Sequence, residues 1–438
     1  MSMKFALVGQ DIPMLLPALL ADLLFAGKES GAEVAVHEPN AAMREVLQGY
    51  GDAVFRRAGL GGGLRVTGDR KEALAGAECV IYAGDPQAAS RFFMDRSALE
   101  SDQEDDPGLT DQARVNGGIE GLMHALRAGG EILRLCGEMD ECCPGTLVVN
   151  LGQPAARTAA VFLDRGYRCY TLGRTPMKGA SGVDTYAKRM RIAPENLKAD
   201  TAGLPGFAFL TELKDGTSDL LPKLKKAAAD GELGNLSQRW LAWWDAVPAG
   251  DVTDLAEFLP AQPDYIPEAK PEFGETVEKR KERILYMNTV REQGAEAQEG
   301  AMAQLLLLSK APPIRPMRLA LALLRKETAE IPAVARRNGK IMPQLPAEAV
   351  VETTLRLENG GDRTENVRVP EALAEILTEV DAANRLAAKA AAGDRAALRE
   401  YAETDPALGG LDRLYCMDVI SALIRMNQDI LGQTFPEE

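Results

Sequence analysis

The sequence predicts an α/β protein that begins with a doubly wound parallel sheet and continues into an α+β domain. Two observations carry this prediction. Short apolar runs alternate with helix-length segments over residues 1–175, and proline- and charge-rich loops followed by long helices take over from about residue 176. The apolar runs alternate little with polar residues, as in strands covered by helices on both faces. We therefore expect two domains, residues 1–175 and residues 176–438.

Six strands and their connecting helices can be placed along the first domain from apolar spacing and from the glycines that follow. The segment 86–115 gives no predictable conformation. The expected strands are Lys4–Gly9, Glu33–His37, Leu64–Thr67, Cys79–Tyr82, Gly145–Gly152 and Tyr167–Gly173. The expected helices are Met14–Phe25, Ala41–Arg57, Arg70–Ala75, Gly118–Leu135 and one that begins at Ala155.

Long helices dominate the last seventy residues of the chain. Apolar residues there recur at the i, i+3, i+4 and i+7 positions that form one face of a helix. We interpret these stripes as core or as contacts between subunits. Their members are Leu373, Ile376, Leu377 and Val380 in one stripe, and Ile420, Leu423 and Ile424 in another.

Composition and charge exclude several classes of protein. The net charge of −15 repels phosphate backbones, so we expect no nucleic-acid partner. No apolar run reaches the length of a membrane-spanning helix, so we expect no membrane partner. The first nine residues lack the pattern of a signal peptide, which predicts a cytoplasmic location. The six cysteines show no CxxC spacing and are expected to be free, buried thiols.

The turn after the first strand reads GQDIPML, and it gives a mixed indication for a dinucleotide. Such a site needs glycines that let backbone N–H groups approach the pyrophosphate, and only Gly9 is in place. Asp11 adds negative charge there, and Pro13 removes a backbone donor. Glu38 argues the other way, because an acidic residue ending the second strand is placed to hold a ribose diol of NAD. The alternative for Glu38 is a solvated residue at a strand end.

Three later stretches resemble glycoside hydrolase family 4. NGKIMPQLPAEAVVE (338–352) is similar to the family's N-G-x-I-x-N-L-P-x-x-x-V-V-E signature. AAGDRAALREYAETDPALGGLD (391–412) resembles its C-terminal A-x-x-G-D…D-P run, and VTGDRKEALAGAECVIYAG (66–84) its T-x-D-x-x-E-A segment. The resemblance spans nearly the whole chain and implies a lactate/malate-dehydrogenase-like fold, a Rossmann-like domain followed by the α+β domain.

The resemblance also implies a particular chemistry. Members of the family use NAD to oxidise the sugar at C3 transiently, which acidifies the proton at C2. A tyrosine removes that proton, a divalent metal stabilises the enediolate, and the aglycone leaves by elimination. The family forms dimers or tetramers, so we expect a homo-oligomer. The apolar stretch AQLLLLS (303–309) and the terminal helices are candidate contacts.

The family's chemical motifs do not carry over to this chain. The metal-binding cysteine of its G-L-C-N segment corresponds to Gly173, and Cys169 upstream is no obvious substitute. The metal-binding histidine of its G-L-N-H segment corresponds to Gly206, which follows Pro205. Glycine has no ligating side chain, so we predict no metal at the family site.

The remaining site motifs are altered in part. An ungapped comparison that keeps Gly117 and Gly118 places Asp106 where the family has its catalytic tyrosine. The N-Y-T-N-P motif, which contacts sugar and cofactor, reads NLGQP, in which Asn150 remains and Gln153 replaces the second asparagine. We predict Asp106 as the catalytic position, Gly9, Glu38 and Asn150 as cofactor-binding, and Gln153, Arg114 and Asn116 as sugar-binding.

Three functions stay open at this point. The first is a non-catalytic relative whose pocket binds a sugar or another small ligand, or which only supports assembly. The second is a carbohydrate enzyme with a rebuilt site, in which the acidic run ESDQEDDPG (100–108) supplies a base or binds a hard cation and His124 lies nearby. A solvated loop and a packed histidine are the alternative interpretations. The third is an ordinary NAD-dependent glycosidase whose ligands are misaligned.

Overall fold

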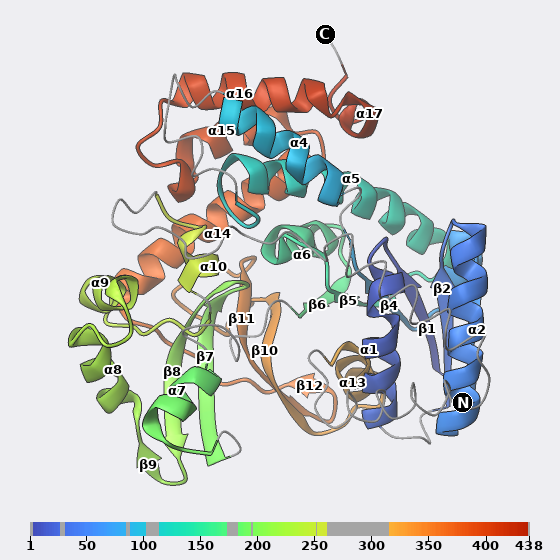
Figure 1. Ribbon diagram of the computed structural model, residues 1–438, viewed down its shortest axis with the longest axis horizontal. Helices are drawn as coiled ribbons and strands as arrows, with labels where there is room; N and C mark the ends of the chain where they lie inside the picture. Colours follow the sequence, from blue (N-terminus) through green and yellow to red (C-terminus); the bar gives the residue numbers. More distant parts are fainter. Residues whose placement is uncertain are drawn as a thin grey trace.

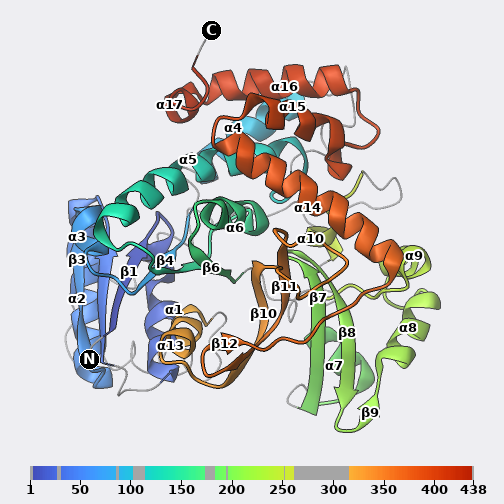
Figure 2. The ribbon, with the colours of Figure 1, turned by 180° about the vertical axis from the view of Figure 1, so that it is seen from behind.

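The computed structural model describes residues 3–26, 31–84, 88–101, 114–172, 183–193, 196–250, 252–260 and 315–436. Its described strands form one twelve-stranded sheet with the order β3-β2-β1-β4-β5-β6-β10-β11-β7-β8-β9, and β12 pairs with β11. Helices pack along this sheet, as Figures 1 and 2 show from opposite sides. The expected α/β fold is confirmed.

The first half of the sheet is parallel and follows the order 3-2-1-4-5-6. This is the strand order of dinucleotide-binding folds, and the six strands lie where the sequence predicts them. The elements are β1 (Met3–Val8), α1 (Ile12–Phe25), β2 (Ala32–His37), α2 (Ala41–Ala58), β3 (Gly62–Thr67), α3 (Arg70–Leu74), β4 (Cys79–Tyr82), α4 (Ala88–Ser101), α5 (Gly118–Cys142), β5 (Leu147–Asn150), α6 (Ala155–Asp164) and β6 (Arg168–Thr171).

The second half continues the same sheet with antiparallel strands. The domain boundary near residue 175 stays a prediction, because β10 pairs directly with β6 across it. The elements are α7 (Val183–Met190), β7 (Leu197–Leu204), β8 (Phe207–Asp215), β9 (Ser218–Asp219), α8 (Leu221–Ala229), α9 (Asn235–Trp244), α10 (Val252–Ala256), α13 (Pro316–Leu324), β10 (Ala329–Arg337), β11 (Val350–Glu358), β12 (Gly361–Asp362), α14 (Glu371–Ala391), α15 (Arg395–Thr404), the 3-10 helix η5 (Pro406–Leu408), α16 (Arg413–Met426) and α17 (Gln428–Leu431).

Helix α13 returns to the first half of the molecule and packs against α1. Asp22 of α1 is fully buried, and its Oδ2 accepts the backbone N–H groups of Met317 (2.7 Å) and Arg318 (3.0 Å) at the start of α13. A carboxylate at a helix N-terminus is favourable, but burial dominates and raises the pKa of Asp22 to about 7.

The C-terminal helices rest on α4 and α5 through a buried polar cluster. Arg127 of α5 and Asp95 of α4 form a fully buried ion pair with 2.7 Å between Nη1 and Oδ2. Asn427 donates to the other Asp95 oxygen (3.1 Å), and His124 Nδ1 lies 2.9 Å from Arg127 Nη2. His124 is therefore a packed histidine. The predicted stripes of α14 and α16 are core, since all their members except the half-buried Ile376 are buried.

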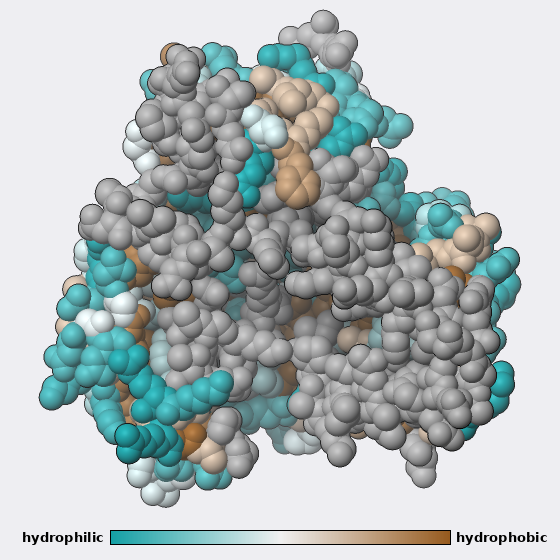
Figure 3. Space-filling model, viewed as in Figure 1, coloured by the Kyte–Doolittle hydropathy of each residue, from teal (hydrophilic) through white to brown (hydrophobic). Residues whose placement is uncertain are grey.

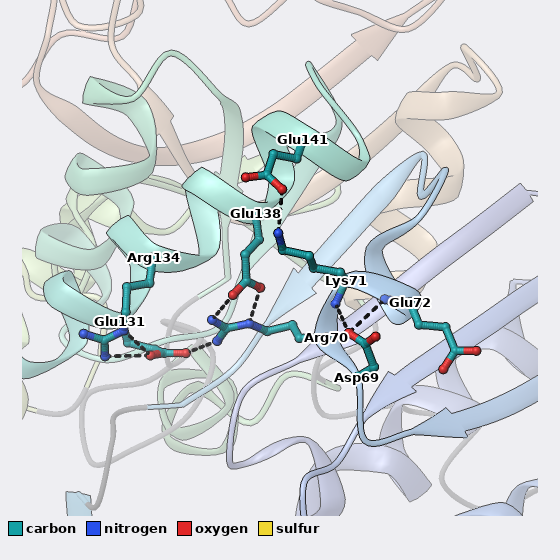
Figure 4. Close-up of polar contacts among 8 residues, drawn as sticks. All are labelled: Asp69, Arg70, Lys71, Glu72, Glu131, Arg134, Glu138 and Glu141. Carbon is teal, nitrogen blue, oxygen red and sulfur yellow. Dashed lines mark hydrogen bonds and ion pairs between the residues drawn. The ribbon is translucent and has the colours of Figure 1, made fainter.

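Ion pairs at the surface fasten α3 to α5. Figure 4 shows Arg70 reaching Glu138 and Glu131, and Lys71 reaching Glu141. The Arg70 guanidinium donates twice to Glu138, at 2.5 and 2.7 Å. In Figure 3 the coloured surface over α8 and β9 is mainly hydrophilic, as the acidic composition suggests. None of the described helices is long and apolar enough to cross a membrane, and all six cysteines are free thiols, only Cys142 being partly exposed.

Candidate functional site at the carboxyl ends of the parallel strands

Gly9 directly follows β1 and lies against the backbone of Ala83, which directly follows the neighbouring strand β4. Its φ of +124° is a conformation that other residues rarely adopt. A Cβ atom built there would lie 1.9 Å from the carbonyl oxygen of Ala83. Gly9 is thus required by the close approach of two strands, independently of any cofactor.

The first turn of α1 has few backbone donors left for a pyrophosphate. Asp11 N–H donates to the carbonyl of Ala83 (3.2 Å), and Ile12 N–H donates to the carbonyl of Gly9 (3.2 Å). Pro13 has no N–H, and Met14 N–H donates to Asp11 (3.0 Å). Dinucleotide-binding folds rely on free N–H groups at this helix end. The residues present here do not fit a tightly bound NAD.

Glu38 lies where the sequence predicts it, directly after β2. Its backbone N–H donates to Thr67, and its Oε1 accepts the backbone N–H of Asn40 at 2.8 Å. Asn40 in turn caps α2 through its own side chain. One oxygen of the buried Glu38 carboxylate is therefore used in shaping the start of α2, and its role in binding ribose stays a prediction.

Asn150 ends β5 and is fully buried in a network of its own. Its amide nitrogen donates to the hydroxyls of Thr158 (2.9 Å) and Thr171 (3.1 Å), and its oxygen accepts Gly152 N–H (2.9 Å). The Asn150 amide thereby ties β5 to β6 and to α6. Gln153 follows on the same edge, half-buried, before a cis peptide bond to Pro154.

The start of α6 carries buried donors. The backbone N–H groups of Ala155, Ala156 and Arg157 have no acceptor in the described part of the chain, and all three residues are buried. Buried N–H groups are rarely left unpaired in proteins, so water or a ligand oxygen is expected here. Unlike α1, this helix has donors to offer at the carboxyl edge of the sheet.

Arg114 and Asn116 meet Glu257, a residue that sequence reasoning missed. Glu257 Oε2 accepts Asn116 Nδ2 (2.8 Å) and the backbone N–H groups of Asn116 (2.9 Å) and Val115 (3.2 Å). Arg114 donates to the carbonyls of Glu257 (3.1 Å) and Leu259 (2.5 Å). Burial, aided by Asp254, raises the pKa of Glu257 to about 7. Both side chains therefore join the start of α5 to the segment after α10, and their role toward sugar stays a prediction.

The position that corresponds to the family's metal-binding histidine is the corner of a hairpin. Pro205 and Gly206 form the two-residue turn between β7 and β8, since Leu204 pairs with Phe207. Gly206 has φ +81°, and a Cβ there would touch the ring of Phe258 at 3.4 Å. No group of three or more potential metal ligands occurs within the described ranges. The described residues therefore do not fit the family's metal centre.

Two predicted positions, Asp106 and Gly173, lie outside the described residues. Cys169 is buried inside β6, where burial raises the pKa of its thiol to about 12. Such a thiol is neutral at physiological pH.

A second buried carboxyl, on Glu352 of β11, also escaped the sequence reasoning as a site residue. Strand register places Glu352 beside Ala335, Ala335 beside Thr171, and Thr171 beside Asn150. Neighbours in register point to the same face of a sheet, so Glu352 shares a face with the Asn150 network. It is 1% exposed, and burial raises its pKa to about 8.

Comparison with known proteins supports the resemblance to glycoside hydrolase family 4. Residues 201–408 match the family model described as family 4 glycosyl hydrolase C-terminal domain. An alpha-glucosidase of Erwinia rhapontici is 25% identical over 233 residues, which cover 52% of this chain and 50% of the relative. An alpha-galactosidase of Bacillus subtilis (strain 168) is 22% identical over 227 residues, 52% of this chain and 51% of the relative. The chain thus matches about half the length of these curated relatives.

Solved structures agree on the fold. The lplD protein of Bacillus subtilis has a TM-score of 0.75 at 18% identity, with coverage of 96% of this chain and 99% of its own. A 6-phospho-alpha-glucosidase from gut microorganisms, solved with NAD and Mn2+, has a TM-score of 0.73 at 16% identity, covering 98% of this chain and 99% of its own. Malate dehydrogenase of Plasmodium falciparum reaches 0.50 at 11% identity, over 89% of this chain and 98% of its own. The expected lactate/malate-dehydrogenase-like architecture is confirmed.

Proposed function

We propose that this chain, whose residues 201–408 match the family 4 glycosyl hydrolase C-terminal domain, binds a sugar or a related small ligand without NAD- and metal-dependent elimination chemistry. The first turn of α1 carries the proposal, because its backbone donors are used within the fold or absent at Pro13. The glycine at position 206 supports it independently, since a hairpin corner has no side chain to ligate a metal.

The ligand in this proposal lies at the carboxyl edge of β5 and β6. Donors from the first turn of α6 face that edge, and ligands of doubly wound folds bind in such crevices. Sugar hydroxyls and ring oxygens can accept these N–H groups. A ligand there would satisfy donors that are buried without acceptors in the described chain.

An active carbohydrate enzyme with a rebuilt site is the second candidate. Glu352 favours it, because a buried carboxyl with a pKa of about 8 can hold or release a proton near neutral pH. In this version the chain hydrolyses or rearranges a glycoside with carboxyl groups alone.

Release of nitrophenol from a panel of aryl α- and β-glycosides tests both versions. Each substrate is incubated with the protein alone, with NAD, with Mn2+ and with both. The proposal predicts no release that depends on NAD and Mn2+ together. Release of nitrophenol without NAD and without Mn2+ would support the second candidate, an enzyme with a rebuilt site. Release only with both would defeat the proposal and restore the family's chemistry to this chain.

A further inference from the structure

Glu352 occupies a position where a carboxyl group is costly. It lies in a central strand of the sheet, between β10 and β7, and is 1% exposed. Its Oε2 is buried with no hydrogen-bond partner, and its side chain makes no hydrogen bond or ion pair with the described residues. An unpaired buried polar group costs about 1–3 kcal/mol, and more when it is charged. An apolar residue would be expected there if the position served only the fold.

The immediate neighbours of the carboxyl group in the sheet are small. The two residues in register with Glu352 are Ala335 on β10 and Gly203 on β7, whose side chains are a methyl group and a hydrogen. On the same face, Val350 packs with α6 residues, and Leu210 of β8 packs with Tyr186 of α7. Glu352 therefore lies on the sheet face that α6 and α7 cover, between the rows that pack against these two helices.

Some polar groups near Glu352 are hydrogen-bonded within the protein, and others have no acceptor among the described residues. Thr171, two strands away in the same row, is bonded to Asn150. Thr158 of α6 binds the same amide, which places the start of α6 over this face. The unaccepted N–H groups of Ala155 and Ala156 belong to that first turn. Carboxyl and amide groups without protein partners thus occur on one face of the sheet.

We propose that Glu352 is a ligand-contacting residue, whose carboxyl group exchanges a hydrogen bond with a hydroxyl of a sugar seated over Ala335 and Gly203. The inference rests on the proposed function for the identity of the ligand. It goes further by assigning the contact to one residue. It also explains why β11 keeps a carboxyl group in its buried centre: the cost in the free protein is recovered when the ligand binds.

The test compares Glu352→Gln and Glu352→Leu with the wild-type chain and with Glu358→Gln. Glu358 lies on the same strand, is exposed, and forms an exposed ion pair with Arg363. Thermal unfolding of the free proteins is followed between pH 5 and pH 9. Binding of D-glucose, D-galactose and D-galacturonate is measured by calorimetry at pH 7.

The expected result has two parts. Both Glu352 variants unfold at the same or a higher temperature than the wild type at pH 7. The difference in unfolding temperature between the variants and the wild type grows as the pH rises from 5 to 8, because the wild-type carboxyl must ionise while buried. This difference levels off above pH 8. Any sugar that the wild type binds is bound at least 10-fold more weakly by both variants and unchanged by Glu358→Gln.

Two results would overturn the assignment. A thermal unfolding midpoint several degrees lower for both Glu352 variants, but not for Glu358→Gln, would show that the carboxyl group stabilises the fold. Equal sugar affinity in wild type and variants would show that it touches no ligand. If the wild type binds none of the three sugars, the proposed function fails for them. The pH profile is a separate readout: less stable variants refute the inference even if no sugar binds.

Discussion

Replacing Asn338 by alanine tests whether the family 4-like signature of residues 338–352 is structural in this chain. Asn338 is 1% exposed, and its Nδ2 donates to the carbonyls of Met342 (2.9 Å), Leu345 (3.0 Å) and Pro346 (2.9 Å). Its Oδ1 accepts Met342 N–H at 2.7 Å. One side chain thus closes the whole loop between β10 and β11.

The magnitude follows from these contacts. The two Nδ2 protons are shared among three carbonyls and count as about two bonds, and Oδ1 adds a third. At roughly 1 kcal/mol net each, Asn338→Ala should lower the free energy of unfolding by about 3 kcal/mol. A chain of 438 residues has an unfolding entropy near 0.9 kcal/mol/K at about 2.1 cal/mol/K per residue, so the midpoint should fall by about 3 °C. Asn338→Asp should be worse at pH 7, because a carboxylate would face the carbonyls of Met342, Leu345 and Pro346.

Calorimetry and urea unfolding measure both variants against Asn366→Ala. Asn366 is exposed and makes no hydrogen bond within the described residues, so its replacement should change the midpoint by less than 1 °C. A loss below about 1 kcal/mol for Asn338→Ala would refute the reasoning. It would mean that the loop keeps its shape without the amide.

Two further substitutions test the buried charges. Asp95→Asn should destabilise the chain by about 3–5 kcal/mol in urea unfolding, because it leaves the Arg127 charge buried without its counter-ion. Glu232→Gln, which breaks an exposed pair with Arg189, should cost less than about 1 kcal/mol, and equal losses would contradict the argument. Because the folded pKa of Asp22 is raised to about 7, wild-type stability should fall as the pH rises from about 4 to 7. Asp22→Asn should make that fall shallower without removing it, because Glu257 and Glu352 also have raised pKa values. An equal slope in wild type and variant would contradict the argument.

The parallel half of the sheet could be predicted from the sequence because its signals are local. Apolar runs such as Cys79–Tyr82 are bounded by glycines, and that strand is found with the predicted limits. The interpretation of GQDIPML for a cofactor stays a prediction, although Gly9 and Pro13 do lie within the one turn that the sequence singled out. The residues that shape this turn lie within a few positions of those that would bind a cofactor.

The features that could not be predicted from the sequence depend on contacts between residues that are distant along the chain. Glu257 clamps Asn116 across 141 positions, and no local pattern links the two residues. In the sequence, Glu352 is one residue of a strand motif with no sign of a separate role. Only the strand register places it beside Ala335 and Gly203. The continuation of the sheet from β6 to β10 joins residues about 160 positions apart, a pairing that periodicity does not specify.

The roles given to Gly9, Glu38, Asn150, Gln153, Arg114 and Asn116 stay predictions, as do the homo-oligomer and the cytoplasmic location. The structure adds a physical reading to several of them. Both Nδ2 protons of Asn150 are used within the fold, and Arg114 is bonded to two backbone carbonyls. A ligand oxygen would have to displace a bond to reach Asn150 Nδ2, whereas the first turn of α6 needs no such exchange.

Thermal unfolding with and without millimolar NAD tests the central claim most directly. A ligand at about 100 times its dissociation constant stabilises a fold by roughly 2.7 kcal/mol, which corresponds here to a rise of about 3 °C. The used donors of the β1–α1 turn predict no change in the midpoint at any NAD concentration tested. A saturable rise of that size would show that the turn accepts a dinucleotide, and the proposed loss of NAD-dependent chemistry would be wrong.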